Sequence, residues 1–348
     1  MQPHPHDIRE LTEDELKGFF TRKGEKAFHG KQVYEWLWKK GAVDFQRMSN
    51  LSKASRKLLE EHFSIPALTL AQEQTSADGT LKMVFRTADG MPIESVLIPS
   101  GPRATACISS QVGCKLACTF CATGQIPFQR NLTLGEIYDQ VVALWRKAEG
   151  KYGLSLSNIV YMGMGEPLLN YEHVAGSVHM ISGGKGLGMS PRRLTISTVG
   201  IPGGIRKLAD DGLRSELAVS LHSAIDEVRT RLVPVSKKFD LQNLKEALQY
   251  FTRKTGKRIT FEYLLLKDVN DRISDARALA EYSRNFPVKI NLIEYNEVEG
   301  SGFYRSEARQ TEDFKAFLEE RNMIVNIRRS RGQDIDAACG QLAGKKGK

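Results

Sequence analysis

The distribution of apolar and polar residues divides the chain into three regions. The first 65 residues predict a small helical domain, because Thr12-Glu13-Asp14-Glu15 has the spacing of a helix-capping box and two further helical stretches follow at about 31–40 and 52–62. Residues 66–100 indicate a β extension. From about residue 104 onward, short β-branched runs alternate with helical stretches.

The β extension holds one acidic residue in an apolar setting. In Pro92–Pro99, Glu94, Val96 and Ile98 share one face by the two-residue period of a strand. A carboxylate that shares a face with two aliphatic side chains either lies at the solvated edge of a sheet or is buried for a purpose. The pattern alone favours the edge.

The third region predicts an α/β fold with a parallel sheet. The β-branched runs fall at 104–110, 158–163, 193–198, 216–222, 258–265 and 288–295, with a further strand expected near 323–328. The clearest helices are Thr133–Ala148, which starts with a Thr133/Glu136 capping box, and Asp240–Thr255, which Gly256 stops. Six such units predict a partial (β/α)6 barrel, open on one side. The alternative is an open doubly wound sheet, although no glycine-rich dinucleotide turn follows the first strand.

These patterns give four parts: a helical domain at 1–65, a β extension at 66–100, the barrel at 101–300 and a C-terminal segment at 301–348. The Gly/Lys stretch 343–348 is expected to fray.

Composition indicates a soluble globular protein, with 41% hydrophobic and 26% charged residues among 348. No apolar run approaches the length of a membrane span, and the polar, acidic N-terminus lacks the features of a secretion signal, so a cytoplasmic location is expected. The net charge of +9 favours a polyanionic partner but equally fits a basic enzyme without one. Part of the excess lies near the end of the chain, at Arg328, Arg329, Arg331, Lys345, Lys346 and Lys348.

Four of the five cysteines fall between Cys107 and Cys121, and Cys339 stands alone near the end. An odd number of cysteines without a secretion signal argues against a disulfide framework. Cys114, Cys118 and Cys121 form a C-x3-C-x2-C triplet between the first barrel strand and the next helix. Three such thiolates can each bind a different iron of a cubane cluster, which leaves the fourth iron open. A structural zinc site with Cys107 as fourth ligand is the alternative, but no second ligand pair accompanies the triplet.

Five motifs occur in order along the chain. They are CISSQVGCKLACTFCATGQ (107–125), GMGEP (163–167), SPRRLTISTVG (190–200), VSLHS (219–223) and DIDAACGQL (334–342). The triplet resembles the signature of the radical S-adenosylmethionine superfamily. Together the motifs resemble the RlmN family of RNA adenine-C2 methyltransferases over nearly the whole chain. The resemblance implies a barrel of the radical S-adenosylmethionine type, a [4Fe-4S] cluster on the triplet and two S-adenosylmethionine molecules per turnover.

The resemblance also implies which residues bind S-adenosylmethionine: Gly165, Glu166, Ser197, Ser220, Leu221, His222 and Asn296. All of them are expected at the C-terminal ends of barrel strands, where such folds hold their active sites. Glu166 suits the ammonium group of the ligand. His222 could instead be a satisfied barrel histidine, and Gly163–Gly165 could be only a tight turn.

The family mechanism assigns roles to three more residues. Adenine C2 is electron-poor, so a carbon radical is needed to methylate it. By resemblance, Cys339 accepts a methyl group, a 5′-deoxyadenosyl radical activates that group, and Glu94 accepts a proton. Cys107 then attacks the sulfur of Cys339, and the disulfide that forms releases the product. This mechanism requires the C-terminal segment to fold back over the barrel.

The resemblance implies an adenine of 23S rRNA and an adenine beside the tRNA anticodon as substrates. The basic N-terminal helices and Arg328, Arg329 and Arg331 are expected to contact the RNA backbone. A flavodoxin or ferredoxin is the expected electron donor, and a monomer is expected. The alternatives are a Cfr-type enzyme that methylates C8, a methylthiotransferase and a zinc-stabilised RNA-binding protein. A methylthiotransferase would need a second set of cysteines, which this sequence lacks.

Overall fold

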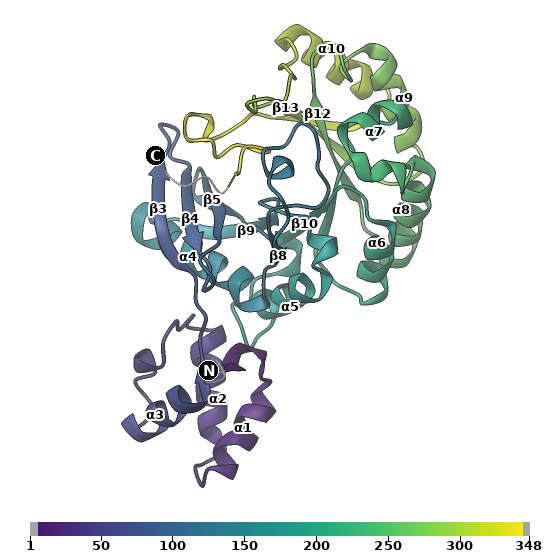
Figure 1. Ribbon diagram of the computed structural model, residues 1–348. Helices are drawn as coiled ribbons and strands as arrows, with labels where there is room; N and C mark the ends of the chain where they lie inside the picture. Colours follow the sequence, from purple (N-terminus) through teal and green to yellow (C-terminus); the bar gives the residue numbers. More distant parts are fainter. Residues whose placement is uncertain (1–5, 344–348) are drawn as a thin grey trace.

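A computed structural model of the protein describes residues 6–343 (Figure 1). Lys345, Lys346 and Lys348, and the expected fraying beyond Ala343, lie outside the described residues.

The N-terminal helices lie to one side of the rest of the chain (Figure 1). They are α1 (Glu13–Arg22), α2 (Phe28–Trp38) and α3 (Lys53–His62), and the short strands β1 (His6–Asp7) and β2 (Phe63–Ser64) pair in parallel beside them. The predicted capping box is confirmed, because Thr12 accepts the N–H of Glu15 and the Glu15 carboxylate accepts the N–H of Thr12.

A sheet of ten strands forms the centre of the rest of the fold, and a separate two-stranded sheet pairs β7 (Gln111–Val112) with β8 (Arg130–Asn131). The order of the ten strands is β14-β13-β12-β11-β10-β9-β6-β5-β4-β3. The antiparallel part is β3 (Thr69–Thr75), β4 (Leu81–Arg86) and β5 (Pro92–Ser100), which joins β6. The parallel part is β6 (Arg103–Cys107), β9 (Ser155–Tyr161), β10 (Leu194–Thr198), β11 (Glu216–Ser220), β12 (Ile259–Leu265), β13 (Val288–Glu294) and β14 (Ile324–Arg328). All seven parallel strands lie within two or three residues of the predicted runs.

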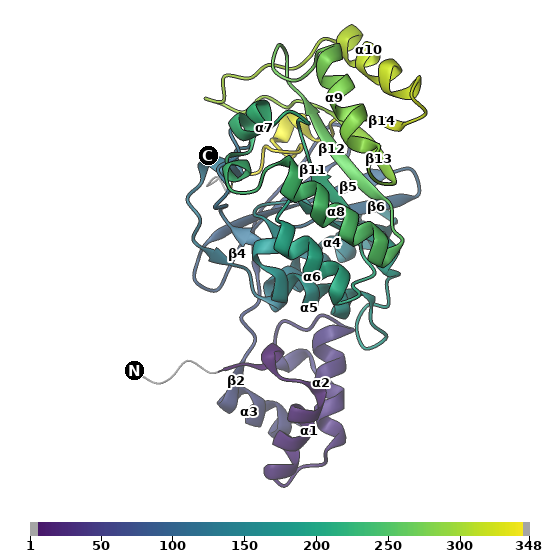
Figure 2. The same cartoon turned by 90° about the vertical axis from the view of Figure 1, so that its right-hand side faces the viewer.

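The strand order excludes the doubly wound alternative. From β6 to β14 each strand pairs with the next one in the sequence, so every right-handed crossover runs in the same direction and places its helix on the same face. The helices are α4 (Leu134–Tyr152), α5 (Tyr171–Ser182), α6 (Pro202–Asp210), α7 (Asp226–Leu232), α8 (Leu241–Thr255), α9 (Ile273–Ser283) and α10 (Ala308–Glu319). Figure 2 shows α5, α6 and α8 side by side on this outer face. The partial barrel is confirmed, and within residues 6–343 its sheet ends at β14 and β3 without closing.

The prediction that Glu94 lies at a sheet edge is wrong. β5 pairs with β4 on one side and β6 on the other, and the Glu94 residue is 2% exposed. The sequence shows one β extension, whereas the structure turns it into three antiparallel strands that continue the barrel sheet. Glu94 is therefore an interior carboxylate.

The N-terminal helices are anchored on α4. Arg9 is buried and forms an ion pair with Asp139 over 3.0 Å, while its guanidinium also donates to the carbonyl of Pro66 over 2.9 Å. The rings of Trp38 and Tyr138 meet edge to face with centroids 5.0 Å apart. Among residues 6–343, no helix has the length and apolar character needed to cross a bilayer.

Candidate functional site

The cysteine triplet lies on the loop between β6 and α4, as predicted. Cys121 N–H donates to the carbonyl of Cys118 over 3.2 Å, and Gly124 N–H donates to the carbonyl of Cys121 over 3.0 Å, so the loop is a series of tight turns. Ala117 adopts φ 51°, a left-handed conformation that non-glycine residues rarely hold. Leu116 and Phe120 of the loop belong to a separate apolar cluster, which also includes Leu232, Val233 and Leu264.

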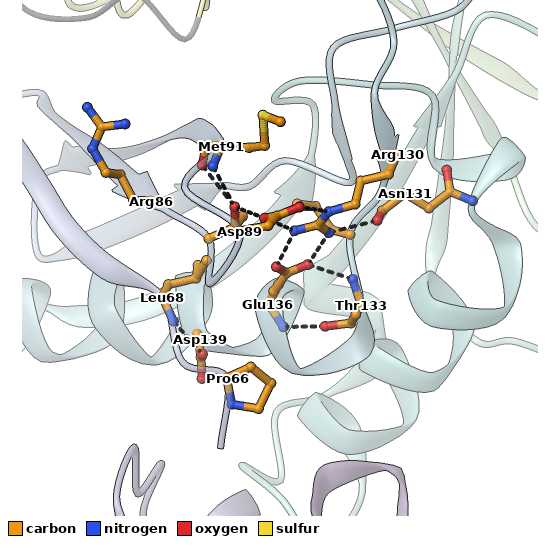
Figure 3. A network of polar contacts seen from close by, with 12 residues as sticks. Pro66, Leu68, Arg86, Asp89, Met91, Arg130, Asn131, Thr133, Glu136 and Asp139 are labelled. Atoms are coloured by element: carbon orange, nitrogen blue, oxygen red, sulfur yellow. Dashed lines mark hydrogen bonds and ion pairs between the residues drawn. The ribbon is translucent and has the colours of Figure 1, made fainter. Parts of the chain in front are cut away.

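The exit of this loop is fixed by a polar network that Figure 3 shows. The guanidinium of Arg130 donates to both oxygens of Asp89 over 2.7 and 2.8 Å and to both oxygens of Glu136 over 2.8 Å (Figure 3). Glu136 also accepts the N–H of Thr133 in the predicted capping box of α4. Arg130 therefore joins the turn between β4 and β5 to the start of α4.

One pocket brings most of the predicted site residues together. It is lined by Cys114, Cys118, Cys121, Gly165, Glu166, Ser197, Ser220, His222 and Cys339, among others. Burial raises the pKa of Cys114 to about 11 and that of Cys118 and Cys121 as well. The thiols are therefore neutral until a metal displaces their protons.

Glu166 is buried in this pocket and held by backbone groups. Its carboxylate accepts the N–H of Leu168 over 3.0 Å and the N–H of Val199 over 2.9 Å. Burial raises the pKa of Glu166 to about 7, although these hydrogen bonds oppose the rise. A cationic ligand would favour the charged carboxylate. Gly165 has φ 97°, and a Cβ there would lie 2.5 Å from the side chain of Gln111, so only glycine fits this turn.

His222 is a satisfied barrel histidine that also lines the pocket. Its Nδ1 accepts the N–H of Leu264 over 3.1 Å, and its ring meets that of Phe120 edge to face at 4.7 Å. Burial and then the charge of Arg229 lower the pKa of His222 to about 3, so the ring is neutral.

Two predicted residues do not line the pocket. Leu221 is fully buried, and its backbone N–H donates to the carbonyl of Glu262 over 3.0 Å. The side chain of Asn296 is already occupied, because it accepts from Gln333 over 2.7 Å and donates to the carbonyl of Cys339 over 3.3 Å. Asn296 therefore contacts the C-terminal segment in this structure.

The C-terminal segment (residues 329–343) folds back over the barrel. Ala122 N–H donates to the carbonyl of Gly340 over 2.7 Å, and the hydroxyl of Thr123 donates to the carbonyl of Leu342 over 2.5 Å. A second cavity is lined by both Cys107 and Cys339, together with Cys121. All five cysteines are free thiols, and burial raises the pKa of Cys107 to about 12.

Sequence reasoning missed an ion pair at the junction of the two cavities. Arg328 lines both of them and pairs with Glu262 over 3.2 Å, and Asn291 donates to the other oxygen of Glu262 over 2.9 Å. The side chain of Arg328 therefore faces the site, and its expected contact with the RNA backbone stays a prediction. The sequence feature that could have revealed this pair is Glu262, a carboxylate in the largely apolar strand ITFEYLL, whose seven residues are all buried.

The donor set fits an iron–sulfur cluster. The three cysteines face one pocket, and each thiolate of a cubane site binds its own iron. Within the described part of the chain, no three Cys, His, Asp or Glu side chains come close enough to share a single metal ion. Cys107 lines only the second cavity, so it does not complete a four-thiolate zinc site in this arrangement.

Comparison with known proteins agrees with this arrangement. A family model for the ribosomal RNA large subunit methyltransferase N-terminal domain matches residues 6–65, and the radical SAM superfamily model matches residues 108–280. A probable dual-specificity RNA methyltransferase RlmN of Flavobacterium johnsoniae is 49% identical over 345 residues, which cover 99% of both chains. A protein of Thermotoga neapolitana with the same description is 44% identical over 97% of both. The chain belongs to the RlmN family.

Solved structures support the same assignment. A radical SAM methyltransferase from Sphaerobacter thermophilus superposes with a TM-score of 0.93 at 38% identity, covering 98% of this chain and 100% of that one. SuiB of Streptococcus suis bound to S-adenosylmethionine shares the fold, with a TM-score of 0.50 at 14% identity over 70% of this chain and 53% of that one. This RlmN-family protein is a radical S-adenosylmethionine methyltransferase that uses a [4Fe-4S] cluster.

Proposed function

We propose that the enzyme methylates C2 of an adenine in 23S rRNA and of an adenine beside the tRNA anticodon, through a methylated cysteine. The observation that carries this proposal is the shared cavity of Cys107 and Cys339, which borders the pocket of the cysteine triplet. A methyltransferase that only bound S-adenosylmethionine would not need two further thiols in one cavity.

The cofactors are held by the pocket of the cysteine triplet. Cys114, Cys118 and Cys121 bind the cluster, which with S-adenosylmethionine supplies the radical that activates an unreactive C–H bond. Glu166 receives the ammonium group of S-adenosylmethionine, and Ser197 and Ser220 offer hydroxyls to its polar groups. Gly165 leaves room for the ligand and His222 lines the wall, while Leu221 supports that wall through its backbone hydrogen bond to Glu262. Asn296 holds the segment that carries Cys339 beside the pocket.

Cys339 is the methyl acceptor. It is exposed, lines both cavities, and follows the two small residues Ala337 and Ala338. The guanidinium of Arg328 lines the same two cavities as the Cys339 thiol, which acts as the nucleophile.

Glu94 and Cys107 complete the reaction. Once the carbon from Cys339 is joined to adenine C2 and the adduct has given up its unpaired electron, for which the cluster would be the acceptor, Glu94 accepts the proton that leaves C2. The thiolate of Cys107 then attacks the sulfur of Cys339 and the bond between that sulfur and the new carbon breaks. The bonding pair stays with the carbon side, which takes up a proton to give the methyl group, and a disulfide remains. The high pKa of Cys107 keeps this thiol protonated until a base removes its proton.

Several features support RNA as the substrate. The lining of the second cavity includes Arg328, Arg329 and Arg331, whose side chains suit phosphate groups. The relatives described above are named as dual-specificity RNA methyltransferases. A flipped adenine can enter through the open side of the partial barrel, and the helical domain at 1–65 provides a second contact with the RNA. We place the reaction in the cytoplasm, with a monomeric enzyme and a flavodoxin or ferredoxin as electron donor.

The test is anaerobic reconstitution followed by iron and sulfide analysis and mass spectrometry of treated RNA. We expect about four irons and four sulfides per chain by cubane stoichiometry, cleavage of S-adenosylmethionine under strong reductant, and 2-methyladenosine as product. Formation of 8-methyladenosine would identify the Cfr-type reaction instead. A colourless protein that holds only zinc would contradict the proposal entirely.

A further inference from the structure

Arg229 on α7 is a fully buried arginine whose described hydrogen bonds all go to neutral oxygens. The Arg229 residue is 1% exposed. Its Nε donates to the carbonyl of Leu221 over 3.2 Å, and its two terminal nitrogens donate to the hydroxyl of Ser236 and the carbonyl of Val199. These acceptors belong to the segments that follow β10, β11 and α7.

A charge in this position is costly unless something offsets it. Among residues 6–343, Arg229 forms no ion pair, since each described partner is a carbonyl or a hydroxyl. Transferring a guanidinium from water to a protein interior costs several kcal/mol. Only a nearby opposite charge recovers a cost of that size. Burial accordingly lowers the pKa of Arg229, and the acidic groups of Tyr282, Cys118 and Asp226 oppose that fall.

Neither nearby carboxylate serves as its partner. Asp226 lies one turn earlier on α7, where it accepts the N–H of Leu241 over 2.9 Å and so fixes the start of α8. Glu166 lies on the other side of Val199 and accepts the N–H of that residue, while Arg229 binds its carbonyl. Among the described residues, no carboxylate therefore pairs directly with Arg229, and Asp226 offsets its charge only from a distance.

α7 packs directly against the cysteine loop. Thr119, the residue after Cys118, donates its N–H to the carbonyl of Leu232 over 3.1 Å, and Leu232 lies one turn after Arg229. Cys118 and Leu232 belong to the same apolar cluster. The interior thiol of the triplet thus lies beside the helix that carries the unpaired guanidinium.

We propose that Arg229 is the fixed counter-charge of the iron–sulfur cluster and a positioning residue for the S-adenosylmethionine pocket. This inference rests on the proposed cluster ligands. Three thiolates give a cubane a net negative charge, and reduction adds another, so a fixed cation nearby stabilises the reduced state. The same guanidinium holds together the backbone that presents Ser197, Ser220 and His222. One side chain thereby couples the ease of reduction to the geometry of the pocket.

The test is the reduction potential of the reconstituted cluster, measured by anaerobic redox titration. Arg229→Gln is expected to make reduction at least tenfold less favourable, which for one electron is a shift of about 59 mV to more negative potential. Arg229→Lys should recover most of the shift because it restores the charge. Ser236→Ala is the matched control, since it removes a partner of Arg229 and leaves the charge, so its potential should equal that of the wild type.

A second variant covers the case in which Arg229→Gln does not fold. Ser236→Asp keeps Arg229 but places a carboxylate against it, so the potential should again become more negative. Iron and sulfide content separates this inference from the proposed function. A wild-type protein that assembles no cluster overturns the proposed function. If the reduction potential is unchanged in both Arg229→Gln and Ser236→Asp, Arg229 only holds the backbone by hydrogen bonds. That result overturns the inference.

Discussion

The backbone N–H of Ala343 donates a hydrogen bond to the carboxylate of Glu94 over 3.3 Å. Glu94 belongs to an interior strand of the antiparallel extension, and Ala343 lies four residues after Cys339. The contact therefore ties the proposed proton acceptor to the segment that carries the proposed methyl acceptor. It also means that Glu94 has a structural task beside its chemical one.

Cys339→Ala tests the role of the methyl acceptor. We expect no methylated adenine, because the variant lacks the sulfur that carries the methyl group, while iron and sulfide contents stay at the wild-type level. The measurement is nucleoside mass spectrometry alongside metal analysis. Methylation at the wild-type rate in this variant would show that the carbon does not pass through Cys339.

Glu94→Gln separates the two tasks of Glu94. The amide oxygen can still accept the N–H of Ala343, but the group no longer takes a proton, so turnover should fall by about 10²–10⁴-fold with little loss of stability. Glu94→Ala also removes the hydrogen bond and should make Cys339 react faster with an alkylating reagent. Equal turnover in Glu94→Gln and wild type would remove Glu94 from the mechanism.

The ion pair between Arg328 and Glu262 predicts a change in thiol reactivity. Arg328 lowers the pKa of Cys107 against the larger effect of burial, so Arg328→Met should slow alkylation of Cys107 several-fold at fixed pH. The variant also leaves Glu262 buried without its cation, and this should lower the free energy of unfolding by about 3 kcal/mol at most. Arg329→Met is the control, because Arg329 is exposed and makes no such pair among the described residues. Equal slowing in both variants would contradict a specific effect of Arg328.

Arg130 predicts a stability effect at the exit of the cysteine loop. Arg130→Met leaves the buried carboxylate of Glu136 without its cation and should lower the free energy of unfolding by about 1–3 kcal/mol, with weaker retention of the cluster. Asp89→Asn, which alters only the half-exposed end of the network (Figure 3), should cost less than about 1 kcal/mol. Denaturant unfolding of both variants measures the difference, and a larger loss in Asp89→Asn would reverse this assignment.

The attachment of the C-terminal segment should weaken in acid. Burial works to raise the pKa of Asp78, but hydrogen bonds from Thr80 and from the N–H of Gly332 outweigh it and hold the pKa at about 2. A lowered pKa in the folded state stabilises the protein above the ordinary pKa of about 3.9, and this stabilisation is lost as the pH falls from about 4 to about 2. Thermal unfolding between pH 5 and 2 should therefore show a steeper loss in the wild type than in Asp78→Asn. Parallel curves would show that Asp78 does not contribute.

The regular parts of the fold could be predicted because their signals are local. The capping boxes at Thr12 and Thr133, the stop at Gly256 and the β-branched runs each depend on a few neighbouring residues. The C-terminal ends of parallel strands share one edge, so Glu166, Ser197 and Ser220 could be brought together from sequence alone.

The remaining features depend on contacts between distant segments. The burial of Glu94 depends on β5 being covered by β4 and β6, and a short sequence pattern does not reveal whether a strand has two neighbours. Arg328 and Glu262 meet because β14 and β12 both flank β13, which no spacing rule gives. The fold-back of Cys339 is set by hydrogen bonds to Ala122 and Thr123, more than two hundred residues earlier in the chain.

Those two hydrogen bonds have a consequence for how the end of the chain can vary. Both acceptors are main-chain carbonyls, so many side chains at Leu342 would preserve the hydrogen bond, whereas Gly340 has φ 83° and favours glycine. The number of residues is a stricter constraint. Adding or removing one residue between Cys339 and Leu342 would displace the sulfur by about 3.3 Å along the chain, the span of one extended residue. Spacing, together with the glycine at position 340, keeps the methyl carrier in reach of its partners.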